Sequence, residues 1–349
     1  NLDVVDIDGA VDMASTLVVG GVVNLSTGSE SSPALFFNSD SDTGIYSGGS
    51  NTVVITAGGS NRFYADASTH LGTLTAGTSN LALGVNAGNS IESGGNYNVL
   101  VGDEAGTAIT TGDYNVFVGF VAGDATTTGR ENIAMGGYSL GSNTTGTNNT
   151  AVGSGSLQSN TTADNNTSVG YNSLAANTTG DRNVAMGGLA LDANTTADGN
   201  TAFGYDSLST NTGSELNVAI GFNALRLYNN GSGSGYNTAV GALAGAAVTT
   251  GINNTLIGGL AGDAITTAND NVAVGKGSLT ADTTGAENTA VGNVTLAFNT
   301  TGASNAAFGY GALYANTTAS NNTAIGYLSL SANTTGASNT AVGKDSLAA

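Results

Sequence analysis

The chain lacks several residue types, and each absence excludes a class of site. Its 349 residues include no cysteine, no tryptophan, one proline and one histidine, His70. Without cysteine there can be no disulfide and no thiolate metal site, and a single histidine excludes a site built from several imidazoles. We therefore expect no cofactor and no bound metal, interpret His70 as a turn residue, and do not expect an enzyme.

Basic residues are also scarce. Six Lys and Arg stand against 25 Asp and Glu, so the formal net charge is -19. Such an acidic chain is unsuited to DNA, RNA or an anionic membrane surface. The sequence contains no run of 18 apolar residues, so we also expect no insertion into a membrane.

Glycine, in contrast, is abundant, with 54 residues. Sixteen of these glycines follow an asparagine by four residues and recur every 17 residues, with one step of 18 and one of 20. Units this short cannot bury a core of their own and must stack on one another. The sequence predicts an all-β fold: a stacked parallel β-roll or β-solenoid of sixteen coils over residues 80–349, on the order of 75 Å long, after a β-rich fibre shaft or connector over residues 1–79.

The recurring asparagine and glycine are interpreted as structural. Identical residues in stacked coils lie above one another, and stacked asparagines can pass amide hydrogen bonds from coil to coil. We predict an asparagine ladder with a matching row of glycines. Its members include Asn149, Asn166, Asn183, Asn200 and Asn217, with Gly153, Gly170, Gly187, Gly204 and Gly221.

The three residues between asparagine and glycine form a strand pattern. The residue before the glycine is always apolar, and alanine precedes it in twelve of the sixteen units. We expect the apolar residue to face the core and the alanine to face outward, kept small where another subunit approaches. This interpretation predicts a homotrimer.

Four residues after the glycine, eleven units carry leucine and five carry a second glycine, for example Gly106 and Gly262. Four of these five glycine units place an apolar residue three residues further on, such as Ile109 and Ile265, where leucine units usually carry asparagine. The exchange keeps the core volume roughly constant, so we interpret both positions as structural.

Threonine pairs close the units, as in Thr178-Thr179-Gly180. We expect their hydroxyls to form hydrogen bonds with backbone groups of the turn. We expect the three-residue insertion around 229–235 to lie in an exposed loop of this turn. Rows of threonine are also typical of ice-binding β-solenoids, which we retain as a remote alternative.

Aromatic residues directly follow the recurring glycine in six units: Phe120, Tyr171, Tyr205, Phe222, Tyr310 and Tyr327. Exposed rings can stack on sugars, so these residues are candidate contacts to a host cell-surface glycan. Packing across a subunit interface is the alternative.

Acidic residues near the N-terminus have spacings that cation sites use. Asn38, Asp40 and Asp42 alternate as in a calcium loop, but the glycine comes late at Gly44 and the closing glutamate is missing. We interpret them as a structural turn. The aspartates at 3, 6, 8 and 12 are interpreted as solvated turn acids, with a cation held in a trimer as the alternative.

Two families share these patterns. The stretch from Asn149 to Leu157 and the unit Val218-Ala219-Ile220-Gly221 resemble head repeats of YadA-type trimeric autotransporter adhesins, which build a parallel β-roll in a homotrimer. They also resemble repeats of bacteriophage tail fibres, especially of phages that infect cyanobacteria. Residues 33–47 are similar to a segment common in such fibres.

The resemblance implies a structural fibre protein of a phage virion, extracellular, that acts as a rigid spacer and an adhesive surface in host attachment. Self-association into a homotrimer is the implied partnership. A bacterial trimeric surface adhesin or an extracellular filament is the alternative, and the 17-residue unit is longer than that of the adhesins.

Overall fold

The computed structural model describes residues 27–37, 40–49, 52–58, 60–65, 71–72 and 77–348. Packing divides the chain into two units, Asn1–Leu74 and Thr75–Ala349. His70, Asn38 and the four N-terminal aspartates of the sequence analysis lie outside the described residues.

The first unit contains one antiparallel sheet whose five strands pair in chain order. They are β1 (Leu35–Phe37), β2 (Asp40–Gly49), β3 (Thr52–Ala57), β4 (Ser60–Ala65) and β5 (Leu71–Gly72). In β3, Val54 is buried whereas Val53 and Ile55 are exposed. Such alternation is that of a sheet with one covered face.

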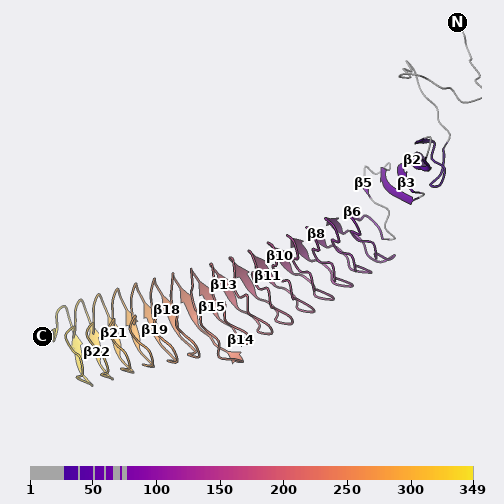
Figure 1. Cartoon of the computed structure of the whole chain (residues 1–349). Coiled ribbons are helices and arrows are strands. Elements are labelled where there is room, and N and C mark those ends of the chain that lie inside the picture. The colour runs from indigo at the N-terminus through magenta and orange to yellow at the C-terminus, as the bar shows by residue number, and fades with distance from the viewer. Residues whose placement is uncertain are drawn as a thin grey trace, which may run out of the picture. The chain divides into compact units, whose positions relative to one another are not determined.

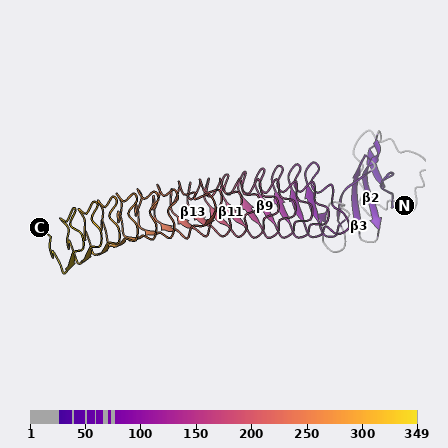
Figure 2. The same ribbon diagram turned by 90° about the horizontal axis from the view of Figure 1, so that it is seen from below.

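The second unit is a parallel β-solenoid with one short strand in each coil, and its coils follow one another in chain order along a gently curved stack (Figures 1 and 2). Sixteen strands, which bound fifteen full turns, pair into a single sheet. The predicted all-β repeat solenoid is thus confirmed. The strands are β6 (Leu81–Leu83), β7 (Val99–Val101), β8 (Val116–Val118), β9 (Ile133–Met135), β10 (Thr150–Val152), β11 (Thr167–Val169), β12 (Val184–Met186), β13 (Thr201–Phe203), β15 (Val218–Ile220), β17 (Thr238–Val240), β18 (Thr255–Ile257), β19 (Val272–Val274), β20 (Thr289–Val291), β21 (Ala306–Phe308), β22 (Thr323–Ile325) and β23 (Thr340–Val342).

The strand faces are the reverse of the sequence prediction. In all sixteen strands the middle residue, mostly alanine, is buried, and the apolar residue before the glycine is not buried in any of them. The prediction was wrong because a small residue suits a crowded interior as well as a close external contact. The argument for a trimer from an outward alanine face therefore fails.

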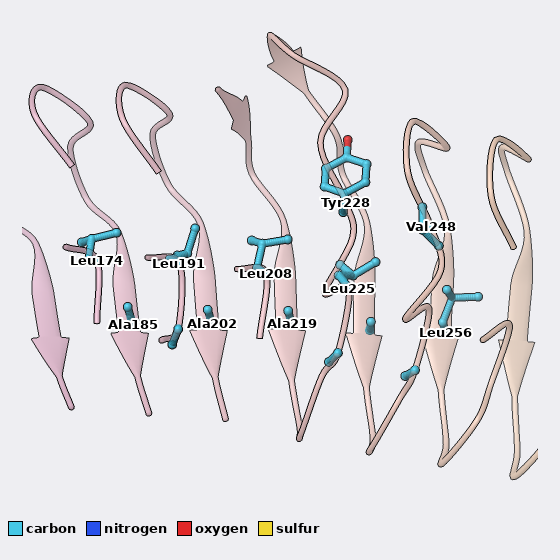
Figure 3. Close-up of a cluster of buried hydrophobic side chains, with 14 of the residues drawn as sticks. Leu174, Ala185, Leu191, Ala202, Leu208, Ala219, Leu225, Tyr228, Val248 and Leu256 are labelled. Carbon is cyan, nitrogen blue, oxygen red and sulfur yellow. The ribbon is translucent and has the colours of Figure 1, made fainter. Parts of the chain in front are cut away.

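The interior explains why the middle residue must be small. Leucines four residues after the recurring glycine form one row inside the coils and the strand alanines form a second row beside it, as Leu174, Leu191, Ala185 and Ala202 show (Figure 3). All four of these side chains are fully buried. Two large residues would not fit across this space.

In three coils the large and small residues exchange places: the strand residue is large and the residue beside it is glycine. Leu100, Phe117 and Leu256 occupy the alanine position, and glycine replaces the leucine beside them. A side chain at Gly106 would collide with Leu100 and Phe117, and one at Gly262 with Leu256. Core volume is conserved, as predicted, but the exchange includes the strand residue as well.

The leucine position has a left-handed backbone in every coil. Leu157 has φ 49° and Leu208 φ 53°, and Gly106 at the same position has φ 59°. A left-handed leucine costs about 1–2 kcal/mol, whereas burying its side chain stabilises by about 1.5–3 kcal/mol. Burial therefore offsets the strain, and glycine is selected where no room remains for the side chain.

The three-residue insertion lies in the turn, as predicted, and Gly231, Ser232 and Gly233 are exposed. It forms β16 (Gly233–Ser234), which pairs with β14 (Ser214–Glu215) of the preceding coil. The fully buried ring of Tyr228 points toward this turn (Figure 3). The enlarged turn therefore accompanies the largest side chain of the solenoid core.

Candidate functional site

The recurring asparagines form one continuous ladder through the solenoid. From the second coil on, each donates its backbone N–H to the Oδ1 atom of the preceding ladder asparagine at 2.8–3.1 Å. The Nδ2 group of Asn149 also donates to the carbonyl of Ala163 in the closing turn at 2.8 Å. The side chain thus ties strand, neighbouring coil and turn together.

The recurring glycines mark a corner that no other residue can occupy. Gly153 has φ 126°, and a Cβ placed on it would lie 2.5 Å from the carbonyl oxygen of Gly170 in the next coil. The corner glycines of the other coils have φ between 121° and 143°. Both the dihedral and the close approach require glycine here.

A second amide ladder was not recognised in the sequence. It lies seven residues after the corner glycine, where Asn160 donates through Nδ2 to Oδ1 of Asn143 at 2.9 Å and Asn177 does the same to Asn160 at 3.1 Å. The signal was present, because leucine units mostly carry asparagine at this position. We refer to the two rows as the first and the second ladder.

The second ladder is interrupted between Asn211 and Asn299. Tyr228, Val248, Ile265 and Asp282 occupy its positions there.

Asp282 is therefore a buried carboxyl in an amide row. It accepts hydrogen bonds from the N–H of Gly285 at 2.8 Å and from Nδ2 of Asn288 at 3.4 Å. Burial outweighs these donors and raises the pKa of Asp282 to about 7.

The outer sheet face, which the first and third residues of each strand form, carries an apolar strip. The third residue is apolar in every strand, for example Met135 and Phe203, which are 42% and 52% exposed, whereas the first residue is threonine in eight of the sixteen strands. The third residues are Leu83, Val101, Val118, Met135, Val152, Val169, Met186, Phe203, Ile220, Val240, Ile257, Val274, Val291, Phe308, Ile325 and Val342. Parallel pairing stacks these residues in register, so their side chains form one strip.

The strip is similar in area to the largest apolar patch of a typical soluble monomer, which is often functional. Over fifteen strand spacings, with the third residue apolar in every strand and the first in half of them, the apolar area is on the order of 400 Å². Soluble monomers rarely expose contiguous apolar patches above a few hundred Å², and larger ones mark interaction sites.

The six candidate glycan contacts are all exposed, between 48% and 63%. Parallel stacking brings Tyr205 and Phe222 to 6.1 Å between ring centroids, and Tyr310 and Tyr327 to 5.4 Å. Phe120 instead meets Tyr138 edge to face at 5.4 Å. Tyr97 and Tyr114, which precede ladder asparagines, stack at 4.9 Å.

The threonine pairs divide into two rows with different environments. The first hydroxyl of each pair is engaged, as Thr161 Oγ1 donates to the carbonyl of Thr178 at 3.0 Å. The second residue, such as Thr162, is exposed. Only one of the two rows is therefore exposed, not the flat array of the remote ice-binding alternative.

Among the described residues, acidic side chains do not gather into a metal site. No group of three or more His, Cys, Asp or Glu that could hold an ion occurs in the part of the chain that the structure describes. Burial raises the pKa of Asp124 and of Asp192, and the nearby carboxylates of Glu104 and Asp206 raise these pKa values further.

Asp40 and Asp42, interpreted above as turn residues, lie in β2. A hydrogen bond between their carboxyl groups lowers the pKa of Asp40 and raises that of Asp42. The turn interpretation of these two residues was therefore wrong.

The described ranges contain no helix with the length and hydrophobicity of a membrane span. Comparisons of the chain with protein-family models, curated proteins and solved structures found no match. The fold and its surfaces are therefore the basis for a functional hypothesis.

Proposed function

We propose that this chain is a structural segment of a trimeric fibre, specifically a phage tail fibre exposed on the virion, where it acts as a rigid spacer and contacts host-surface glycan. The observation that carries the proposal is the outer sheet face, an apolar strip that runs along all sixteen coils. A second and a third copy of the chain would cover this strip. No catalytic role, cofactor or nucleic-acid partner is proposed.

Two properties of the solenoid suit a spacer. Each coil is tied to the next by strand pairing, by the first ladder and by the threonine hydroxyls, so bending would break several hydrogen bonds at once. Stability does not depend on disulfides, because the chain has no cysteine.

Oligomeric mass tests the assembly. Light scattering should give about three times the chain mass of 33.9 kDa at micromolar concentration. Met135→Asp combined with Val152→Asp should dissociate the trimer, because the carboxylates would be buried without partners. Thr145→Asp with Thr162→Asp, on the exposed threonine row, is the matched control and should leave the mass unchanged. A wild-type mass of 33.9 kDa would refute the assembly.

The location is tested separately. Antibodies against this chain should decorate tail fibres of intact virions in immunogold electron microscopy. Decoration of a bacterial cell surface instead would favour the adhesin alternative.

A further inference from the structure

The aromatic row directly after the corner glycines contains one interval that differs from the rest. Four successive coils carry Tyr171, Gly188, Tyr205 and Phe222 at this position. Backbone hydrogen bonds keep the row in register, since the N–H of Leu189 donates to the carbonyl of Tyr171 at 3.0 Å and that of Asp206 to Gly188 at 3.1 Å. Tyr171 and Tyr205 therefore flank a residue without a side chain.

The interval has the dimensions of a slot for one ring. The backbones of Tyr171 and Tyr205 are two coils apart, and two strand spacings amount to about 9.6 Å. A ring held between two others needs two contact distances of about 3.5–4.0 Å. A Cβ on Gly188 would have Tyr205 ring carbons at 3.5 and 3.7 Å and would otherwise meet only the Tyr171 carbonyl, at 3.9 Å. One face of the Tyr205 ring thus looks over bare backbone.

Elsewhere in the row no residue without a side chain lies between two aromatic rings, since Gly137 has Phe120 on one side and Ser154 on the other. Tyr327 stacks on Tyr310 at 5.4 Å on one side, and the Lys344 ammonium lies 5.8 Å from its centroid. Gly259 also lacks a side chain, but its neighbours in the row are Ala242 and Lys276, so no aromatic ring flanks it. The interval at Gly188 thus has a ring on each side.

We propose that Tyr171, Gly188 and Tyr205 form a binding slot for a neutral pyranose with all-equatorial substituents. Such a ring presents apolar C–H groups on both faces and can stack on an aromatic ring at each. An axial hydroxyl would leave only one face apolar. The net charge of -19 disfavours an anionic sugar.

This inference deepens the glycan-contact part of the proposed function. Saturation-transfer NMR with methyl β-D-glucopyranoside tests it, with saturation of the protein's aromatic protons. Transfer should reach H1, H3 and H5 on one sugar face and H2 and H4 on the other. Methyl β-D-galactopyranoside, whose O4 is axial, should show weaker transfer on one face.

Two glycine variants locate the site. Gly188→Tyr should abolish the transfer by filling the slot, and it should fold because its backbone is not left-handed and its Cβ has ordinary contacts. Gly259→Tyr, in the same row, should retain the transfer. Tyr171→Ala with Tyr205→Ala should also abolish it without loss of the melting temperature.

Three results would overturn the slot: no transfer in the wild type, transfer that survives Gly188→Tyr, or binding of phenol without binding of the glucoside. Light scattering on the same samples separates this failure from that of the fibre proposal. A trimeric mass without sugar binding would refute the slot alone.

Discussion

The two amide ladders use the same side chain, yet the first is unbroken over sixteen coils, whereas the second begins only in the fourth coil and is then interrupted for four positions. In the first ladder, Oδ1 of Asn132 accepts the backbone N–H of Asn149 at 3.0 Å. In the second, Oδ1 of Asn143 accepts only the side-chain amide of Asn160. Loss of a first-ladder asparagine therefore leaves a buried backbone group without a partner, whereas a second-ladder pair such as Asn143 and Asn160 can be replaced together by apolar residues. Asn211 is an exception in the second ladder, since its Oδ1 accepts the buried N–H of Ser214 at 3.1 Å.

A shared acceptor adds to this tolerance. The carbonyl of Gly146 accepts Nδ2 of Asn132 at 2.9 Å and Nδ2 of Asn143 at 3.1 Å. Removal of the second-ladder amide leaves that carbonyl satisfied. The comparison teaches that a ladder residue is fixed by the backbone group that depends on it, more than by its own burial.

The largest expected effect is at the carboxyl that interrupts the second ladder. The pKa of Asp282 is about 7 in the folded chain against 3.8 for the free group. Between these values the folded state keeps a proton that the unfolded state has released, so the free energy of unfolding falls as pH rises from about 4 to about 7 and is level above. Asp282→Asn should remove this dependence and stabilise at pH 8 by as much as about 4 kcal/mol.

Denaturant unfolding at pH 5 and pH 8 measures this difference. Asp270→Asn, at an exposed carboxylate that accepts from Asn253 at 2.9 Å, should change it little. If Asp282→Asn and the wild type lost equal stability between the two pH values, the buried carboxyl would not be the titrating group.

The next effect compares the ladders within one coil. Asn132→Leu leaves the N–H of Asn149 without its acceptor and should lower the free energy of unfolding by about 1–3 kcal/mol. Asn143→Leu leaves no backbone group unpaired, because the Gly146 carbonyl still accepts Nδ2 of Asn132. Nδ2 of Asn160 still donates to Ala163 at 3.1 Å, and Oγ1 of Thr126 loses only a long 3.4 Å bond, so the variant should cost less than about 1 kcal/mol. Melting followed by circular dichroism would contradict the comparison if both variants fell equally.

The smallest effect is expected at the C-terminal end of the second ladder. Asn333 is only partly buried and donates to Oδ1 of Asn316 at 3.1 Å. Water can replace it there, so Asn333→Leu should change stability by less than about 0.5 kcal/mol. A loss as large as that of Asn132→Leu would show that burial does not separate the two positions.

The repeat period made the solenoid and the first ladder predictable. Sixteen asparagines at a nearly constant spacing leave a single way to stack, and the hydrogen bond from the N–H of Asn166 to Oδ1 of Asn149 follows from that stacking. Which face of the strand points inward was not predictable from the alanines alone. Ala151 is small because the crowded interior has no room for a larger side chain, and not because another subunit packs against it. Size compensation between Phe117 and Gly123 was the sequence signal that would have oriented the strand.

The remaining features depend on contacts that the sequence pattern does not encode. The pKa of Asp282 depends on how completely its coil excludes water. The binding slot at Gly188 could not be predicted, because it depends on the direction in which the Tyr205 ring leans. Subunit contacts stay a prediction, now based on the outer sheet face.

Thiol labelling of single-cysteine variants tests that face most directly, since the chain has no other cysteine. Met135→Cys places the thiol on the outer sheet face, and Thr145→Cys places it on the exposed threonine row. If copies of the chain cover the face, maleimide should label Met135→Cys much more slowly than Thr145→Cys in the native protein and at the same rate after denaturation. Equal rates in the native protein would contradict the trimeric fibre.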